Sequence, residues 1–251
     1  MKVYIVGAGA GNPEWLTVQA DRLIRQARLC VYAGSLVNPQ IIDMLPASCN
    51  RYDSAHMCLD EIIAICADAH ARDCDVIRLH TGEPSLYGAI GEQMNALKEL
   101  GIEFKMIPGI SAFQAAAAAL QCELTAPEIA QTVILTRTAG RTPLPPEQEL
   151  SKLAEHKATL CIYLSTENVA LICGQLRPCY GDDCPAAVVY HASWPDQQII
   201  CGTLVTLPYL AEESGIKRTA LILVGHALGR PKSVSRLYDA SFSHGYRGSN
   251  R

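Results

Sequence analysis

The sequence predicts an α/β fold made of two α/β domains, and three observations lead to this prediction. Short apolar runs alternate with amphipathic stretches of helical length through the first 120 residues, as in a parallel sheet covered by helices. A polar stretch at 121–129 then interrupts the alternation and carries Pro127. Beyond it, strands rich in β-branched residues indicate a second sheet of mixed direction.

Each expected element of the first domain has a local reason. The run 2–6 is a short buried strand, and Thr17 is a good N-cap for the helix that follows. Gly101 stops a helix, Pro108 ends a strand, and the alanine-rich run 112–120 is a helix suited to close packing. The other expected strands are 29–32, 75–79 and 103–107, and the other expected helices are 58–72 and 87–100.

The second domain is expected to alternate strands and helices less regularly. A loop with three prolines at 137–146 separates its first strand from its first helix. The expected strands are 132–136, 159–164, 186–190, 199–202 and 219–224, and the expected helices are 147–155 and 167–176. We therefore expect domains at 1–120 and 121–230, followed by a polar, basic tail at 231–251.

Composition and charge argue against several classes of function. The 251 residues are 49% hydrophobic and 18% charged, which fits a globular protein with a substantial core. A formal net charge of −4 provides no basic footprint for nucleic acid. Because no apolar run reaches transmembrane length and no signal peptide pattern precedes the first strand, we expect a cytoplasmic protein without a membrane partner.

The 11 cysteines indicate neither a disulfide framework nor a metal site. Their number is odd, and a disulfide framework belongs to secreted proteins. The sequence has no Cys-x-x-Cys pair and no Cys/His cluster at zinc spacing. Since free cysteine packs as a small hydrophobic residue, we expect core packing and no bound metal.

A glycine-rich loop follows the first strand but departs from the nucleotide-binding patterns. Gly7, Gly9 and Gly11 are spaced G-x-G-x-G, and Asn12 stands where a dinucleotide loop needs its third glycine. Pro13 disfavours a helical Asn12, and no Gly-Lys-Ser/Thr follows as in a P-loop. The loop therefore either approaches a ligand other than a pyrophosphate with bare backbone, or forms only a tight turn.

Two further loops are expected at the same edge of the first sheet. Residues 80–88 and 108–112 each follow a strand, and ligands of open α/β sheets bind beyond the carboxyl ends of the strands. Both loops combine glycine, proline and small residues, and neither brings lysine or arginine to this edge. A phosphate-rich ligand would require such cations, so a zwitterionic or cationic ligand is favoured.

Taken in order, the three loops resemble those of the tetrapyrrole (class III) S-adenosylmethionine methyltransferases. That family is known for a G-x-G-x-G loop, a G-D-P-x-x-x-G loop and a P-G-I-S-A loop, which correspond to 7–11, 82–88 and 108–112. Two departures are Ala10, where the family usually has proline, and Glu83, where it usually has aspartate. Further segments resemble the branch that methylates carbon 11 of precorrin-4 on the way to cobalamin: 32–37, 53–57, 189–195, 237–239 and 244–247.

The resemblance implies a tetrapyrrole methylase fold, a homodimer, and S-adenosylmethionine folded in the cleft between the two domains. Glu83 would then direct its carboxylate toward the amino or sulfonium side of the cofactor. The implied cofactor contacts are Ala10, Gly82, Glu83, Leu86, Ser111 and Ala112 from the first half, with Leu164 and Ala192 from the second.

The substrate that the resemblance implies carries many acetate and propionate arms, which need hydrogen-bond donors spread around a trough. Tyr87 is a candidate to stack on either ligand, or else a core residue. For each charged candidate, the alternative is a solvated or structurally paired side chain. The candidate donors are Arg51, His56, Arg137, Arg141, His191 and Arg247. No residue stands out as a catalytic acid or base, and methyl transfer from a sulfonium needs no strong acid because the leaving group departs neutral.

The same residues bear on other functions. A sister enzyme acting at another ring carbon or on uroporphyrinogen is the nearest alternative, and the 194–195 Trp-Pro pair and the closing segments argue against it. A nicotinamide dehydrogenase needs an acidic residue at the end of its second strand, where this chain has 33–35 Ala-Gly-Ser. A non-catalytic tetrapyrrole carrier stays open, as does the question of whether the substrate already holds cobalt.

Overall fold

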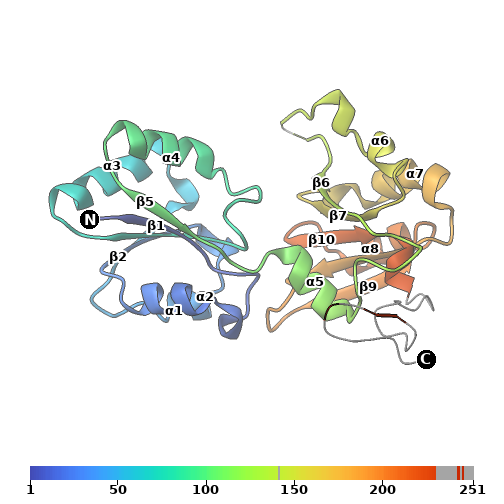
Figure 1. Ribbon diagram of the computed structural model, residues 1–251, viewed down its shortest axis with the longest axis horizontal. Helices are drawn as coiled ribbons and strands as arrows, with labels where there is room; N and C mark the ends of the chain where they lie inside the picture. The colour runs from blue at the N-terminus through green and yellow to red at the C-terminus, as the bar shows by residue number, and fades with distance from the viewer. Residues whose placement is uncertain (141, 230–241, 244, 246–251) are drawn as a thin grey trace. The chain divides into compact units, whose positions relative to one another are not determined.

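The structure is a computed structural model that describes residues 1–140, 142–229, 242–243 and 245. The chain forms two α/β units, each with its own five-stranded sheet (Figure 1). The first unit comprises Met1–Ala119 and His191–Gln198, and the second comprises Leu120–Tyr190 and the described residues from Ile199 onward. In the part of the chain that is described, every helix is too short or too polar to traverse a membrane.

The sheet of the first unit contains β1 (Val3–Gly7), β2 (Leu29–Tyr32), β3 (Asn50–Asp53), β4 (Val76–His80) and β5 (Phe104–Ile107). Its strands are parallel and lie in the order β3-β2-β4-β1-β5. Because helices cover both faces of such a sheet, the inner strands are largely buried, and β4 buries Arg78 and His80 among its apolar residues. Because the strands are parallel, all their carboxyl ends lie at one edge of the sheet, where β4, β1 and β5 are side by side.

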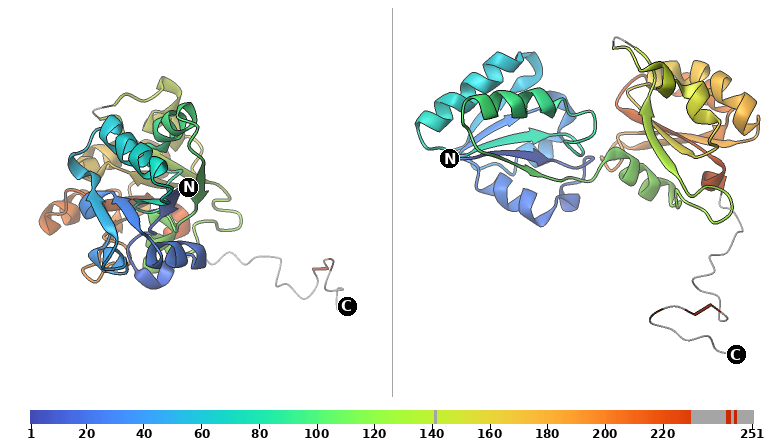
Figure 2. Two further views of the ribbon diagram at one scale, coloured as in Figure 1. Left: turned by 90° about the vertical axis from the view of Figure 1, so that its left-hand side faces the viewer. Right: turned by 45° about the horizontal axis from the view of Figure 1, so that its top comes forward.

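The helices of this unit are α1 (Val18–Arg25), α2 (Pro39–Ile42), α3 (Leu59–Ala71), α4 (Ile90–Glu99) and α5 (Ala112–Leu120). One face of the sheet is covered by α1 and α2 and the other by α3 and α4 (Figures 1 and 2). Ile24 of α1 packs with Ile77 of β4, whereas Leu97 of α4 packs with Val76 on the opposite face. Thr17 caps α1 by accepting a hydrogen bond from the Ala20 N–H, which confirms the expected helix start.

The sheet of the second unit contains β6 (Val133–Arg137), β7 (Thr159–Tyr163), β8 (Pro185–Tyr190), β9 (Gln198–Thr203) and β10 (Ala220–Val224). Their order is β6-β7-β10-β8-β9. Strands β6 and β7 are parallel, whereas β10 runs antiparallel to both β7 and β8. The expected mixed direction of the second sheet is thus confirmed.

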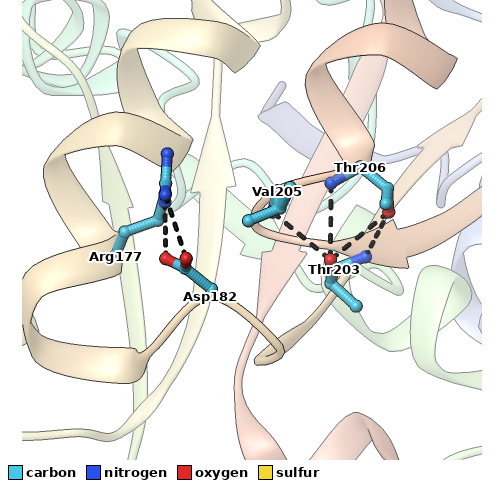
Figure 3. Close-up of polar contacts among 5 residues, drawn as sticks. All are labelled: Arg177, Asp182, Thr203, Val205 and Thr206. Atoms are coloured by element: carbon cyan, nitrogen blue, oxygen red, sulfur yellow. Dashed lines mark hydrogen bonds and ion pairs between the residues drawn. The ribbon is translucent and has the colours of Figure 1, made fainter.

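The helices of the second unit are α6 (Leu150–Ala154), α7 (Val169–Tyr180) and α8 (Leu207–Ser214). Buried Leu176 of α7 and Leu207 of α8 join Ile162 and Ile222 of the sheet in one core. Figure 3 shows two groups of polar contacts that shape the connections. Arg177 near the end of α7 pairs with Asp182, and Thr203 accepts hydrogen bonds from the Val205 and Thr206 N–H groups just before α8.

Several expected boundaries differ from the structure for identifiable reasons. The helix expected at 87–100 begins only at Ile90, because Tyr87 and Ala89 adopt positive φ values of 56° and 48°. The helix expected at 147–155 is a 3₁₀ turn at Pro146–Gln148 followed by the short α6. Among the strands and α-helices of the described residues, those that the sequence did not predict are β3, α2 and α8.

Candidate functional site

Three loops meet at the carboxyl edge of the first sheet. They are the glycine-rich loop (residues 7–13) after β1, the second loop (residues 80–88) after β4 and the third loop (residues 108–112) after β5. Because β1 lies between β4 and β5, the glycine-rich loop has the other two as neighbours. The expectation that these loops lie together is confirmed.

Glycines let the three loops touch through their backbones. The Gly82 N–H donates to the Gly9 carbonyl at 2.8 Å, and the Gly9 N–H donates back to the Gly82 carbonyl at 3.2 Å. A Cβ on Gly7 would lie 2.6 Å from the Gly109 nitrogen and 2.7 Å from the Gly82 oxygen. A Cβ on Gly109 would lie closer still to that oxygen. No other residue fits Gly7 or Gly109 without moving backbone, so the glycines serve loop-to-loop packing.

Glu83 ties the second loop to the third. Its Oε2 accepts a hydrogen bond from the Gly109 N–H at 2.9 Å, and its Oε1 accepts one from the Ser85 N–H at 3.0 Å. Burial raises the pKa of this carboxyl, but the Ser85 and Gly109 N–H groups outweigh burial and leave the pKa below its usual value. In this structure the ionised Glu83 therefore organises the loops.

The third loop leads directly into α5. Ser111 is only 3% exposed, and its N–H donates to the Gln114 side-chain oxygen at 2.9 Å. Its carbonyl accepts the Gln114 and Ala115 N–H groups at 3.1 and 3.2 Å, which begins the helix at Ala112. In the second loop, the half-buried Leu86 donates its N–H to the Glu83 carbonyl at 3.0 Å and closes a turn.

A segment distant in sequence packs on the glycine-rich loop. This clamp segment (His191–Gln198) belongs to the first unit although it follows β8. The Trp194 indole Nε1–H donates to the Ala10 carbonyl at 2.7 Å, across 184 positions of sequence. Ala192 in the same segment is buried. The predicted contacts Ala10 and Ala192 are therefore in the same unit.

Two strand ends of the second unit are joined by side chains. Leu164 follows β7 with a φ of 54° and is 74% exposed, which is unusual for an apolar residue held in a left-handed conformation. Its neighbour Ser165 accepts hydrogen bonds from the Thr138 N–H at 2.9 Å and donates to the Tyr163 carbonyl at 2.7 Å. Thr138 follows β6, so this hydroxyl connects the loops after two adjacent parallel strands.

Comparison with known proteins decides the family. The model of the Tetrapyrrole (Corrin/Porphyrin) Methylases matches residues 2–208. The chain belongs to the tetrapyrrole methylases. A precorrin-4 C(11)-methyltransferase of Pseudomonas aeruginosa is 47% identical over 98% of this chain and 99% of its own length. A cobalt-precorrin-4 C(11)-methyltransferase of Methanocaldococcus jannaschii is 45% identical over 100% of this chain and 97% of its own length.

Solved structures of tetrapyrrole methylases share the fold. The X-ray structure of a cobalt precorrin-4 methyltransferase superposes with a TM-score of 0.88 at 40% identity, covering 90% of this chain and 95% of its own. A uroporphyrin-III C-methyltransferase of Thermus thermophilus, complexed with S-adenosylhomocysteine, has a TM-score of 0.74 at 25% identity. It covers 91% of this chain and 93% of its own. These matches confirm the tetrapyrrole methylase fold expected from the three loops.

Three of the four predicted basic residues that the structure describes have protein partners. Arg137 donates to the Thr138, Thr142 and Pro143 carbonyls, so its guanidinium folds its own loop. Arg51 donates to the Leu45 carbonyl at 2.9 Å and the Pro46 carbonyl at 3.4 Å. The His191 Nδ1 lies 3.0 Å from both carboxylate oxygens of Asp196.

The other predicted positions have different settings. His56 is exposed at the end of the 3₁₀ turn Ser54–His56, and Tyr87 is 44% exposed. Leu164 and Arg137 belong to the second unit, whereas the other described candidates belong to the first. Arg141, Arg247 and most of the closing segments lie outside the described residues. Among the described residues, no group of three or more His, Cys, Asp or Glu side chains is placed to hold a metal ion.

The sequence did not indicate that His80, the last residue of β4, is a buried histidine next to the three loops. Its side chain is 5% exposed, and within the described part of the chain its Nε2 has no hydrogen-bond partner. Burial, together with the nearby Arg78, lowers its pKa to about 3, so the imidazole is neutral. The available signal was a histidine ending an apolar strand directly before a glycine-containing loop of the methylase.

Proposed function

We propose that the protein transfers a methyl group from S-adenosylmethionine to carbon 11 of precorrin-4 or cobalt-precorrin-4 in cobalamin biosynthesis. The observation that carries the proposal is the junction of three glycine-containing loops at one sheet edge. Relatives of 47% and 45% identity over nearly the full chain are named for methylation at this carbon, one with and one without cobalt. They support the reaction and leave both substrates as candidates.

The loops fit S-adenosylmethionine better than a nucleotide phosphate. Gly82 has a φ of 62° and open space where a Cβ would stand, so a ligand can approach its Cα closely. The only side-chain charge that the three loops bring to their junction is the Glu83 carboxylate. A zwitterionic, cationic ligand suits such a surface, whereas a polyphosphate needs basic side chains. The related structure with bound S-adenosylhomocysteine supports this assignment.

The chemistry requires positioning more than acid or base groups. When bound, S-adenosylmethionine supplies an electrophilic methyl group on a sulfonium whose leaving group departs neutral. The task of the loops is to hold the reacting atoms in line, at about 3–3.5 Å, and to exclude water. Backbone groups fixed by Gly7, Gly109 and Glu83 suit this task because they have little freedom to reorient.

The proposed cofactor contacts are those of the three loops, with Leu164 and Ala192 added. Leu164 presents an exposed apolar side chain, which a bound ligand would cover. For the carboxylate arms of the substrate, we keep Arg51, His56, Tyr87, Arg137 and His191 as candidates. The protein hydrogen bonds of Arg51 and Arg137 leave each guanidinium further N–H donors. We also propose a homodimer in the cytoplasm. A monomer mass in solution at micromolar concentration would contradict the dimer, and recovery in a membrane fraction would contradict the location.

A methylation assay with labelled S-adenosylmethionine tests the proposal. It compares precorrin-4 with cobalt-precorrin-4 and locates the new methyl group by mass spectrometry and NMR. One methyl group added at carbon 11 is the expected result, and the preferred substrate identifies the cobalt state. Cofactor binding without transfer to either substrate would indicate a sister specificity or a carrier. Absence of cofactor binding would refute the assignment of the three loops.

A further inference from the structure

Side chains of the clamp segment and of Asn38 fix the backbone of the glycine-rich loop at three consecutive residues. The Ala10 carbonyl accepts the Trp194 indole N–H at 2.7 Å, and the Asn12 N–H donates to the Ser193 hydroxyl at 3.0 Å. Between them, the Gly11 carbonyl accepts a hydrogen bond from the buried Asn38 side chain at 2.9 Å. Polar backbone groups of three successive residues are thus held by side chains, which leaves this part of the loop little conformational freedom.

The indole and the loop are shaped for one another. A Cβ on Gly11 would overlap the indole ring of Trp194, so the ring occupies the space that a side chain at position 11 would need. Gly11 also has a φ of 152°, which other residues rarely adopt. The third glycine of the loop is therefore explained by contact with Trp194, just as Gly7 is explained by the neighbouring loops.

The indole is itself held in place. The His191 ring stacks on it with centroids 4.5 Å apart and an interplanar angle of 24°, and Asp196 holds His191. His191 and Ser193 adopt positive φ values of 45° and 71°, and the Ser193 N–H donates to the Gln197 side chain at 2.7 Å. Such backbone strain persists only where surrounding contacts impose it, and it is concentrated at functional sites.

The geometry points to Trp194 as a positioning residue for the cofactor loop: it sets the conformation of residues 10–12 and thereby the affinity for S-adenosylmethionine. The inference rests on the proposed function, because it takes the glycine-rich loop to be a cofactor loop. Trp194 acts through the Ala10 carbonyl, and the part assigned to it is to hold the loop in its binding conformation before the ligand arrives, which reduces the ordering cost of binding.

The test compares Trp194→Phe with Tyr180→Phe in the full chain. Each change removes one side-chain donor to a backbone carbonyl and keeps an aromatic ring, because the Tyr180 hydroxyl donates to the Ala158 carbonyl in the second unit. Calorimetric titration with S-adenosylhomocysteine should show about tenfold weaker binding for Trp194→Phe and an unchanged affinity for Tyr180→Phe. The KM for S-adenosylmethionine should rise by a similar factor, while kcat and the KM for the tetrapyrrole stay within about twofold.

A second variant tests the proposal if Trp194→Phe does not fold. Ser193→Ala removes only the acceptor of the Asn12 N–H and should weaken S-adenosylhomocysteine binding by about threefold to tenfold. If Trp194→Phe and Ser193→Ala both bind like the unmodified protein, the positioning role is wrong while the proposed function stands. If the unmodified protein itself does not bind S-adenosylhomocysteine, the proposed function fails, and this inference fails with it.

Discussion

The two units join their strand-end loops in different ways. In the first unit, the glycine-rich, second and third loops touch through bare backbone at Gly7, Gly82 and Gly109. In the second unit, the loops after β6 and β7 are joined through a side chain, the Ser165 hydroxyl that receives the Thr138 N–H. The backbone junction has no room for a Cβ at Gly7 or Gly109, whereas the side-chain junction can lose one hydrogen bond without a steric clash.

The two junctions should respond differently to substitution. Backbone contact brings the three loops close together, and at Gly7 and Gly109 only glycine permits that approach. The hydroxyl contact of Ser165 contributes about the free energy of one or two hydrogen bonds. Substitutions at the two junctions should therefore differ in the size of their effect on the free energy of unfolding.

The largest effect is expected at Gly109. Its Cβ would overlap the Gly82 carbonyl, so Gly109→Ala should lower the free energy of unfolding by about 3 kcal/mol or more and abolish cofactor binding. Gly91→Ala is the matched control, because Gly91 lies in α4 with open space around it. Alanine there should stabilise the protein by about 0.5–1 kcal/mol. Urea denaturation measures both, and equal effects would refute the crowded junction.

A smaller effect is expected at Ser165, which is 1% exposed. Ser165→Ala leaves the Thr138 N–H and the Tyr163 carbonyl without this partner, so unfolding should become easier by about 1–3 kcal/mol. Ser151→Ala on the exposed surface of α6 should change it by less than about 0.5 kcal/mol. Urea midpoints of the two variants provide the comparison, and an unchanged Ser165→Ala would show that the hydroxyl does not hold the junction.

The sequence was most informative where local pattern decides structure. Apolar runs identified β1, β2 and β4 because those strands are mostly buried. β5 was identified although only Ile107 in it is buried, because Pro108 marks its end, and motif order identified the three loops. It missed β3, because this edge strand is mostly exposed and its four residues, Asn-Arg-Tyr-Asp, contain no apolar run. It missed α2 because four residues are too few to establish a helical period.

Contacts between distant residues could not be predicted in this way. The hydrogen bond from Trp194 to Ala10 spans 184 positions, and no periodicity within a strand or helix encodes it. The structural role of Glu83 could not be predicted either. Its carboxylate accepts a hydrogen bond from the Gly109 N–H because two loops lie close together, and the sequence of the second loop alone does not show this. Arg137 was predicted to face substrate, but whether its guanidinium folds its own loop depends on carbonyls that only the folded chain brings together.

The smallest effect on the free energy of unfolding is expected at His80. It can be compared with His226, because each histidine lies at or just after the end of a strand, one in each unit. His226 follows β10 with its Nε2 3.1 Å from the Tyr180 carbonyl, whereas the buried His80 at the end of β4 has no such partner for its Nε2 within the described residues. Because the folded-state pKa of His80, about 3, lies below the ordinary 6.5, the unfolded chain binds more protons between these values. Stability from His80 is therefore present above pH 6.5 and is lost as the pH falls toward 3.

Between pH 6.5 and 5.5 this loss should amount to about 1 kcal/mol. His80→Gln, which cannot titrate, should reduce the decline in unfolding free energy over that interval by this amount. His56→Gln changes an exposed imidazole of the same unit and should leave the decline as it is in the unmodified protein. Urea denaturation at the two pH values measures the difference. An equal decline for His80→Gln and the unmodified protein would mean that His80 is not kept neutral by burial, and that this strand end tolerates a charge.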